Sequence, residues 1–123
     1  MPESSTAAQP TLLVVIYADP SENGAAAEAL RMAMGLSTGN RSLQMALMGP
    51  AAQVLGEDVD ELVDGEMMEN HLDIFEDWGT VFHVAKDATE AYDLSDSPVD
   101  VVPIGTDDLA KMMADAHQVM VFR

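Results

Sequence analysis

The chain has 123 residues, of which 48% are hydrophobic, so we expect one domain with a packed core and not a disordered chain. It contains no cysteine, which excludes disulfides, iron–sulfur ligation and the carriage of a persulfide on its own side chains. Twenty-two acidic residues against five basic ones give a net charge of −17, which would repel a phosphate backbone and argues against nucleic-acid binding.

Two interpretations of the acidic surface remain open: a solvated shell suited to high salt, or a surface that meets a basic partner protein. No apolar run approaches the roughly 20 residues that span a bilayer. The first residues lack the basic start and apolar stretch of a secretory signal. We therefore expect a soluble cytoplasmic protein with no membrane partner.

Residues 1–10 are small and polar and contain two prolines, which predicts a disordered tail before a single domain over residues 11–123. The first strand is expected at Thr11–Tyr17, where the apolar run is continuous, as in a strand covered on both faces. A helix should start near Glu22 with Ser21 as its N-cap and end at Gly39-Asn40. Its expected buried stripe is Ala26, Leu30, Ala33 and Met34.

The second strand is predicted at Ser42–Met48, where Gly49-Pro50 stops it. Residues 51–65 are acidic and contain two glycines, which indicates a loop with a short helical piece. A clearer helix is expected from Glu66 to Trp78. Its buried face should hold Met68, Leu72 and Phe75, and Gly79 should end it.

The third strand is expected at Thr80–Ala85, followed by a short helix through Tyr92 that Asp87 caps. The fourth strand is Val99–Ile104, and Gly105-Thr106 leads into a helix with the stripe Leu109, Met112, Met113 and Ala116. The last strand is Gln118–Phe122. Strands that alternate with helices predict a three-layer α/β/α fold of about five mainly parallel strands, with helices on both faces.

No glycine-rich dinucleotide or nucleotide loop follows the first strand, and Asp19 and Glu22 in that turn would repel a pyrophosphate. Asp19 is similar to the acidic residue of a receiver domain's metal pocket. The later residues Ala85-Lys86-Asp87 provide only part of that arrangement. The sequence therefore supports neither nucleotide binding nor the metal pocket of a receiver domain.

The three histidines are too far apart for a sequence-local metal motif. Two of them follow methionines at helical spacing, Met67 with His71 and Met113 with His117, and such thioether and imidazole groups suit Cu(I). Methionines at this spacing are far more often core residues. We expect no metal and no cofactor.

Ligands of open parallel sheets bind beyond the carboxyl ends of the strands. The residues that the predicted strands place at this edge are Asp19, Ser21, Gly49, Ala85, Lys86, Gly105 and Thr106. Lys86, one of two lysines in the chain, would meet an anionic ligand there. The remaining candidate binding residue, His83, lies within the third strand.

Four features resemble the DsrE-like family, which includes the DsrE, DsrF and DsrH and the TusB, TusC and TusD sulfur-relay proteins. They are the apolar first strand with its alanine-rich helix, the break at Met48-Gly49-Pro50, the segment Gly79–Ala88, and the ending from Asp107 to Phe122. The resemblance covers Thr11 to Arg123 and implies the DsrE-like α/β fold.

In sulfur-carrying members of the family, a cysteine ends the third strand just before a short helix, and the matching position here is Ala85. Alanine cannot hold sulfur, so the carrier role does not transfer. The resemblance implies a non-catalytic accessory, structural or small-ligand-binding protein. It would form a homo-oligomer, a trimer or hexamer, or a hetero-oligomer with cysteine-bearing relatives. The alternative is an enzyme using acid/base or metal chemistry through Asp19, His83 or Lys86.

Overall fold

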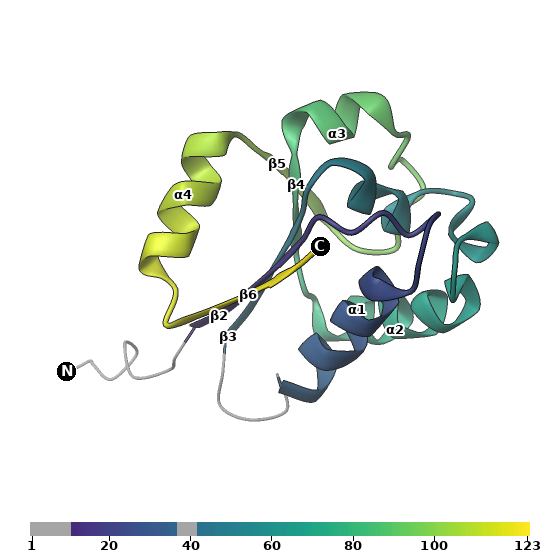
Figure 1. Cartoon of the computed structure of the whole chain (residues 1–123), viewed down its shortest axis with the longest axis horizontal. Coiled ribbons are helices and arrows are strands. Elements are labelled where there is room, and N and C mark those ends of the chain that lie inside the picture. Colours follow the sequence, from purple (N-terminus) through teal and green to yellow (C-terminus); the bar gives the residue numbers. More distant parts are fainter. Residues whose placement is uncertain (1–10, 37–41) are drawn as a thin grey trace.

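The computed structural model describes residues 11–36 and 42–123, which form a five-stranded sheet between helices (Figure 1). All neighbouring strands pair in parallel. The strands are β2 Thr11–Ile16, β3 Ser42–Leu47, β4 Phe82–Ala85, β5 Val101–Ile104 and β6 Gln118–Phe122. The helices are α1 Ala25–Leu36, α2 Gly65–Trp78, α3 Lys86–Ala91 and α4 Thr106–Asp115, with 3-10 helices η2 Gly49–Leu55 and η3 Val59–Glu61. The predicted three-layer fold is confirmed, whereas the predicted tail lies outside the described residues.

The connections between strands explain why helices cover the two faces of the sheet unequally. The spatial order is β5-β4-β3-β2-β6, so the chain steps outward from β2 to β5 and then returns to place β6 beside β2. Parallel crossovers are right-handed in nearly all proteins. The three outward steps therefore place α1, α2 and α3 on one face, and the returning step places α4 on the other, where Figure 1 shows it standing alone.

Strand β2 is buried on both sides, as its continuous apolar run predicted. Leu12, Val14 and Ile16 belong to the larger core cluster beneath α1 and α2, whereas Leu13 and Val15 belong to a smaller cluster with Leu109 of α4. All five residues of β2 from Leu12 to Ile16 are at most 1% exposed. Strand β2 therefore contributes buried side chains to both core clusters.

Helix α2 packs as the sequence predicted. Met68, Leu72 and Phe75 are buried, and Gly79 ends the helix in the left-handed region with φ 70°. The ring of Phe75 meets Phe82 of β4 edge to face, with centroids 5.4 Å apart. This aromatic contact packs α2 against β4, the strand that follows it.

The start of the first helix was predicted wrongly. Helix α1 begins at Ala25 and not near Glu22, and the amide of Ala25 donates to the side chain of Asn23 at 2.9 Å. Ser21 instead donates to Asp19. The predicted helix end at Gly39-Asn40 lies outside the described residues.

The segment predicted mainly as a loop over residues 51–65 is largely 3-10 helix and partly buried. Ala51, Ala52, Val54 and Leu55 of η2 all belong to the larger core cluster. Pro50 stands in the first turn of η2, where its missing N–H costs nothing. Small apolar side chains let this segment pack close to the sheet.

The elements around the last strands differ in detail from the prediction. Ala85, not Asp87, is the N-cap of α3, and no side chain caps that helix. The strands β4 and β5 are shorter at their starts than expected. In α4 only Leu109 is buried, while Met113 of the predicted stripe is 38% exposed.

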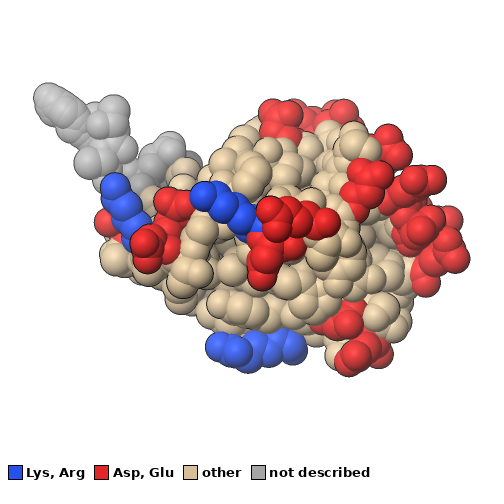
Figure 2. All heavy atoms as spheres, turned by 90° about the horizontal axis from the view of Figure 1, so that it is seen from above, with Lys and Arg blue, Asp and Glu red and all other residues tan. Residues whose placement is uncertain are grey.

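Nearly half of the acidic residues lie in one stretch of the chain. Ten of them lie between Glu57 and Asp77, a segment without lysine or arginine. Figure 2 shows acidic side chains gathered over the end where η3 and α2 lie in Figure 1. Between described residues the salt bridge found is Glu28 with Arg31. In the described ranges, no helix is both long and apolar enough to cross a membrane.

Two histidines bring polar atoms into the interior. The Nδ1 atoms of His71 in α2 and His83 in β4 are buried and have no hydrogen-bond partner among the described residues. Burial lowers the pKa of both imidazoles below the usual 6.5, and the charge of Arg31 adds to this effect at His71. Both side chains are therefore held neutral in the folded protein at neutral pH.

Gly65 stands where the backbone of η3 passes closest to α2. A Cβ atom there would lie 2.1 Å from the carbonyl oxygen of Val59 and 2.9 Å from backbone atoms of Asp60. Gly65→Ala should therefore lower the free energy of unfolding by about 1–3 kcal/mol. Gly35→Ala in α1 is the control, because nothing lies within 4 Å of its Cβ position. That control should be neutral or stabilising by up to about 1 kcal/mol. Urea unfolding measures both, and a fully stable Gly65→Ala variant would contradict the close approach.

The lowered histidine pKa values predict a loss of stability on mild acidification. The unfolded chain binds protons at these two side chains first, so stability is complete above about pH 6.5 and falls as the pH drops toward the folded pKa. Asp19, Glu28 and Asp93, with pKa values lowered from 3.8 or 4.5, act only at more acidic pH.

The measurement is urea unfolding between about pH 7.5 and 5.5. His83→Gln and His71→Gln should each make the decline shallower, by at most about 1.4 kcal/mol per pH unit. The double variant should be nearly independent of pH in this window. An unchanged slope in the double variant would show that other groups cause the decline.

Candidate functional site

The topology creates a crevice between the carboxyl ends of β4 and β5. The chain leaves β4 into α3 on one face of the sheet and leaves β5 into α4 on the opposite face. Two neighbouring strands whose connections diverge in this way leave an opening at their carboxyl ends, which is where open α/β sheets bind ligands. The crevice follows from strand order, which the sequence did not predict.

A pocket of about 300 Å³ occupies this crevice. Its lining residues come from the ends of three strands and the starts of two helices: Met48, Ala85, Lys86, Asp87, Ile104, Gly105 and Thr106. Four of the seven candidate binding residues predicted from the sequence therefore lie together: Ala85, Lys86, Gly105 and Thr106. Met48, Asp87 and Ile104 were missed as lining residues, although each lies within two residues of a predicted strand end and could have been found from that position.

Ala85 is the last residue of β4 and the N-cap of α3, with 7% of its surface exposed. It lies at the mouth of the sheet and lines the pocket, as expected of the position that carries the cysteine in sulfur-carrying proteins that the sequence resembles. A methyl group stands there. The side chain at this point of the pocket wall offers neither a nucleophile nor a hydrogen-bonding group.

The polar groups of the pocket are few and mixed in charge. They are the ammonium of Lys86, the carboxylate of Asp87 and the hydroxyl of Thr106. At the start of α4, the amide of Gly105 donates to Asp108 Oδ2 at 2.8 Å. This amide is therefore already bonded to a carboxylate of the chain itself. No histidine lines this pocket, so the hydroxyl of Thr106 has no imidazole base beside it.

Asp19 and Ser21 form a separate local structure at the end of β2. The amide and hydroxyl of Ser21 donate to Asp19 Oδ1 at 2.9 and 2.6 Å, and the side chain of Gln53 donates to the same oxygen at 3.1 Å. The bonds from Ser21 are the main cause that lowers the pKa of Asp19. Neither residue lines the crevice pocket. Gln53, which ties η2 to this turn, carries no local sequence signal.

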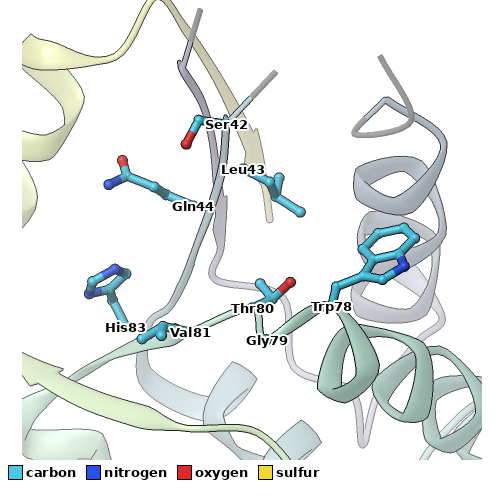
Figure 3. Close-up of a pocket in the computed structure, with 8 residues that line it drawn as sticks. All are labelled: Ser42, Leu43, Gln44, Trp78, Gly79, Thr80, Val81 and His83. Atoms are coloured by element: carbon cyan, nitrogen blue, oxygen red, sulfur yellow. The ribbon is translucent and has the colours of Figure 1, made fainter. Parts of the chain in front are cut away.

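His83 lines a different pocket, at the amino ends of β3 and β4 (Figure 3). That pocket has a volume of about 470 Å³ and is lined by Ser42, Leu43, Gln44, Trp78, Gly79, Thr80, Val81 and His83. In Figure 3 His83 and Gln44 project to one side of the strands and Trp78 to the other. The three residues of the alternative enzyme, Asp19, His83 and Lys86, therefore line no common pocket.

Among residues 11–36 and 42–123, no group of three or more histidine, aspartate or glutamate side chains could hold a metal ion. His117, paired with Met113 in the sequence, accepts a hydrogen bond at Nδ1 from the amide of Thr11 at 3.0 Å. His71, paired with Met67, has its Nδ1 buried. Gly49, also expected at the carboxyl edge, begins η2 with φ 55°.

Comparison with known structures identifies the fold. The ychN protein from E. coli, known from a crystal structure, superposes with a TM-score of 0.67 at 22% sequence identity. The match covers 93% of this chain and 99% of that chain. No curated protein matches the sequence significantly.

The family comparison rests on the sequence itself and covers nearly the whole chain. The sequence model of the DsrE/DsrF-like family matches residues 11–122, from the start of β2 to the end of β6. This confirms the resemblance that the strand ends and the C-terminal segment indicated. The chain is a member of the DsrE/DsrF-like family, and it has no cysteine at the end of β4 or elsewhere.

Proposed function

We propose that this chain is a non-catalytic member of its family, an accessory subunit of a sulfur-relay-type assembly in the cytoplasm. The observation that carries the proposal is the position of Ala85 at the mouth of the crevice, in a pocket that retains its space but has no sulfur-holding group. The subunit would contribute structure or bind a small ligand, while another chain would supply the reactive thiol.

The composition of the pocket supports this assignment over an acid/base or metal-dependent enzyme. The crevice offers one ammonium, one carboxylate and one hydroxyl, from Lys86, Asp87 and Thr106. The imidazole of His83 lines the pocket at the amino ends of the strands instead, and the carboxylate of Asp19 is engaged by Ser21 and Gln53. Acid/base catalysis needs both groups within reach of one substrate.

The assembly would be a homo-oligomer, a trimer or hexamer, or a hetero-oligomer with cysteine-bearing relatives. A strongly acidic chain does not by itself favour either form. In a homo-oligomer, the copies repel each other wherever their acidic residues would meet, which limits the surface available for contact. The small ligand, where one binds, would occupy the crevice beside Ala85 and meet Lys86.

Ala85→Cys should restore sulfur loading if this position is the empty carrier position. The new thiolate would attack the outer sulfur of a small-molecule persulfide, take that sulfur, and release the donor as a thiolate. We expect the wild-type protein to retain no cyanide-labile sulfur and the variant to retain close to one sulfur atom per chain. Intact-protein mass spectrometry and cyanolysis measure this.

Ala91→Cys is the matched control, because Ala91 is the last residue of the same helix and is exposed outside the crevice. It introduces the same single thiol into a cysteine-free chain, so unspecific loading would be seen equally in both variants. Equal loading at the two positions would contradict the special role of position 85. Sulfur retained by the wild-type protein would overturn the proposal of a non-carrier.

A further inference from the structure

The amino ends of β3 and β4 leave a gap in the sheet. Strand β3 begins at Ser42, and its first three residues pair with β2, but its pairing with β4 begins only at Met45 and Phe82. Residues 79–81, which lead from α2 into β4, do not pair with β3. The pocket of about 470 Å³ that contains His83 is lined by both segments. It therefore lies in this gap, at the opposite end of the sheet from the crevice.

Trp78 is held in place beside this gap although it is largely open to solvent. It is the last residue of α2, where Gly79 ends the helix with φ 70°. Its ring meets the buried ring of Phe75 edge to face, with centroids 5.7 Å apart, yet 48% of the residue is exposed. An exposed aromatic ring in a fixed position is a suitable stacking surface, because little conformational freedom is lost when a ligand covers it.

Polar side chains without hydrogen-bond partners line the rest of the pocket. Among the described residues, no hydrogen bond is found for the side chains of Ser42, Gln44 and Thr80. In Figure 3 Gln44 and His83 project to one side of the strands, Trp78 projects to the other, and Thr80 lies between them. Hydroxyl and amide groups both donate and accept hydrogen bonds. A ligand that bridges the gap can therefore meet the indole ring at one end and polar groups at the other.

None of the described residues that line this pocket is an aspartate, glutamate, lysine or arginine. The imidazole of His83 is also uncharged at neutral pH, because burial lowers its pKa. Acidic residues do lie near the opening, such as Asp77 next to Trp78, and together with the net charge of −17 they repel an anion. An anion would meet no countercharge in the pocket, and a cation would meet no carboxylate. The lining therefore fits an uncharged ligand.

We propose that this pocket binds an uncharged, polar small molecule with one flat apolar face, which stacks on Trp78 while its polar groups bond to Gln44 and Thr80. A pyranose ring provides such a face through its C–H bonds, and a planar heterocycle such as a nucleobase provides one through its π system. The volume of about 470 Å³ lies in the range of small-molecule pockets, roughly 300–1,000 Å³. This site does not involve position 85, so the two proposals can fail separately.

Binding can be measured directly, because Trp78 is the only tryptophan of the chain and its fluorescence reports on this pocket. The probes are maltose for the sugar and adenosine for the heterocycle, with adenosine monophosphate and choline as charged comparisons. We expect maltose or adenosine to change the tryptophan emission with a dissociation constant of about 1 mM or below. The neutral probe that binds more tightly identifies the kind of flat face. Both charged probes should bind at least about tenfold more weakly than that probe.

Two results of this titration overturn the proposal. The first is an unchanged emission with both neutral probes at about 10 mM. The second is a charged probe that binds as tightly as the better neutral one, since the pocket would then not select an uncharged ligand. Tight binding of choline would indicate a cation–π site on Trp78 instead.

Substitutions of single polar groups test where the probe binds. Thr80→Val removes a hydroxyl and keeps the shape of the side chain, and Gln44→Leu removes the amide. Each should weaken binding of the better neutral probe about three- to tenfold, the contribution of one hydrogen bond. Thr89→Val is the matched control and should bind as the wild type does, because Thr89 in α3 lines neither this pocket nor the crevice. Urea unfolding checks that all three variants keep the fold. Equal affinity in the three variants would place the probe elsewhere and overturn the proposal.

Discussion

The handedness of the parallel crossover is the constraint on which this structure depends. Three right-handed steps from β2 to β5 place three helices on one face, and the single return to β6 places α4 on the other. That one reversal has two consequences. It opens the crevice between β4 and β5, and it leaves the face of the sheet that carries α4 with one helix to cover five strands. The candidate site and the face covered by a single helix therefore have the same topological origin.

Under the proposed function, position 85 is a site that has lost its chemistry while its geometry remains. The strand still ends at the crevice, a helix still starts there, and a pocket of about 300 Å³ still adjoins it. The alanine side chain at this position has no group that could hold sulfur. The remaining charges are also nearly balanced, since Asp87 lines the same pocket as Lys86 and Asp108 already accepts the amide of Gly105. A neutral or weakly polar ligand suits these surroundings better than a strong anion.

The sequence predicted the elements better than it predicted their arrangement. Periodicity identified the buried face of α2, and the apolar run identified β2, because each pattern depends on burial alone. The start of α1 was misplaced because Ser21 and Asn23 are both good caps, and the bonds from Ser21 to Asp19 decided between them. The 3-10 helix η2 was predicted only as a short helical piece within a loop, because its alanines carry no periodic signal.

The same limit applies to the candidate site. Ala85, Lys86, Gly105 and Thr106 could be predicted because each follows the end of a strand, and strand ends of a parallel sheet meet at one edge. Asp19 and Ser21 also follow a strand, but β2 lies two strands away from β4, and only the spatial order reveals this. Strand order depends on contacts far apart in the sequence, which local patterns do not contain.

The distribution of charge bears on what the acidic surface is for. A uniform solvated shell, as expected from adaptation to salt alone, would place acidic residues wherever the surface is exposed. The chain instead has valine at positions 102 and 121, where 41% of the side chain meets solvent in the isolated subunit, and ten acidic residues between Glu57 and Asp77. Acidic residues are not confined to that segment, since α4 on the other side of the sheet exposes Asp107, Asp108 and Asp115. The feature to be explained is therefore the high density of acidic residues between Glu57 and Asp77, and this segment is where a basic partner would be attracted.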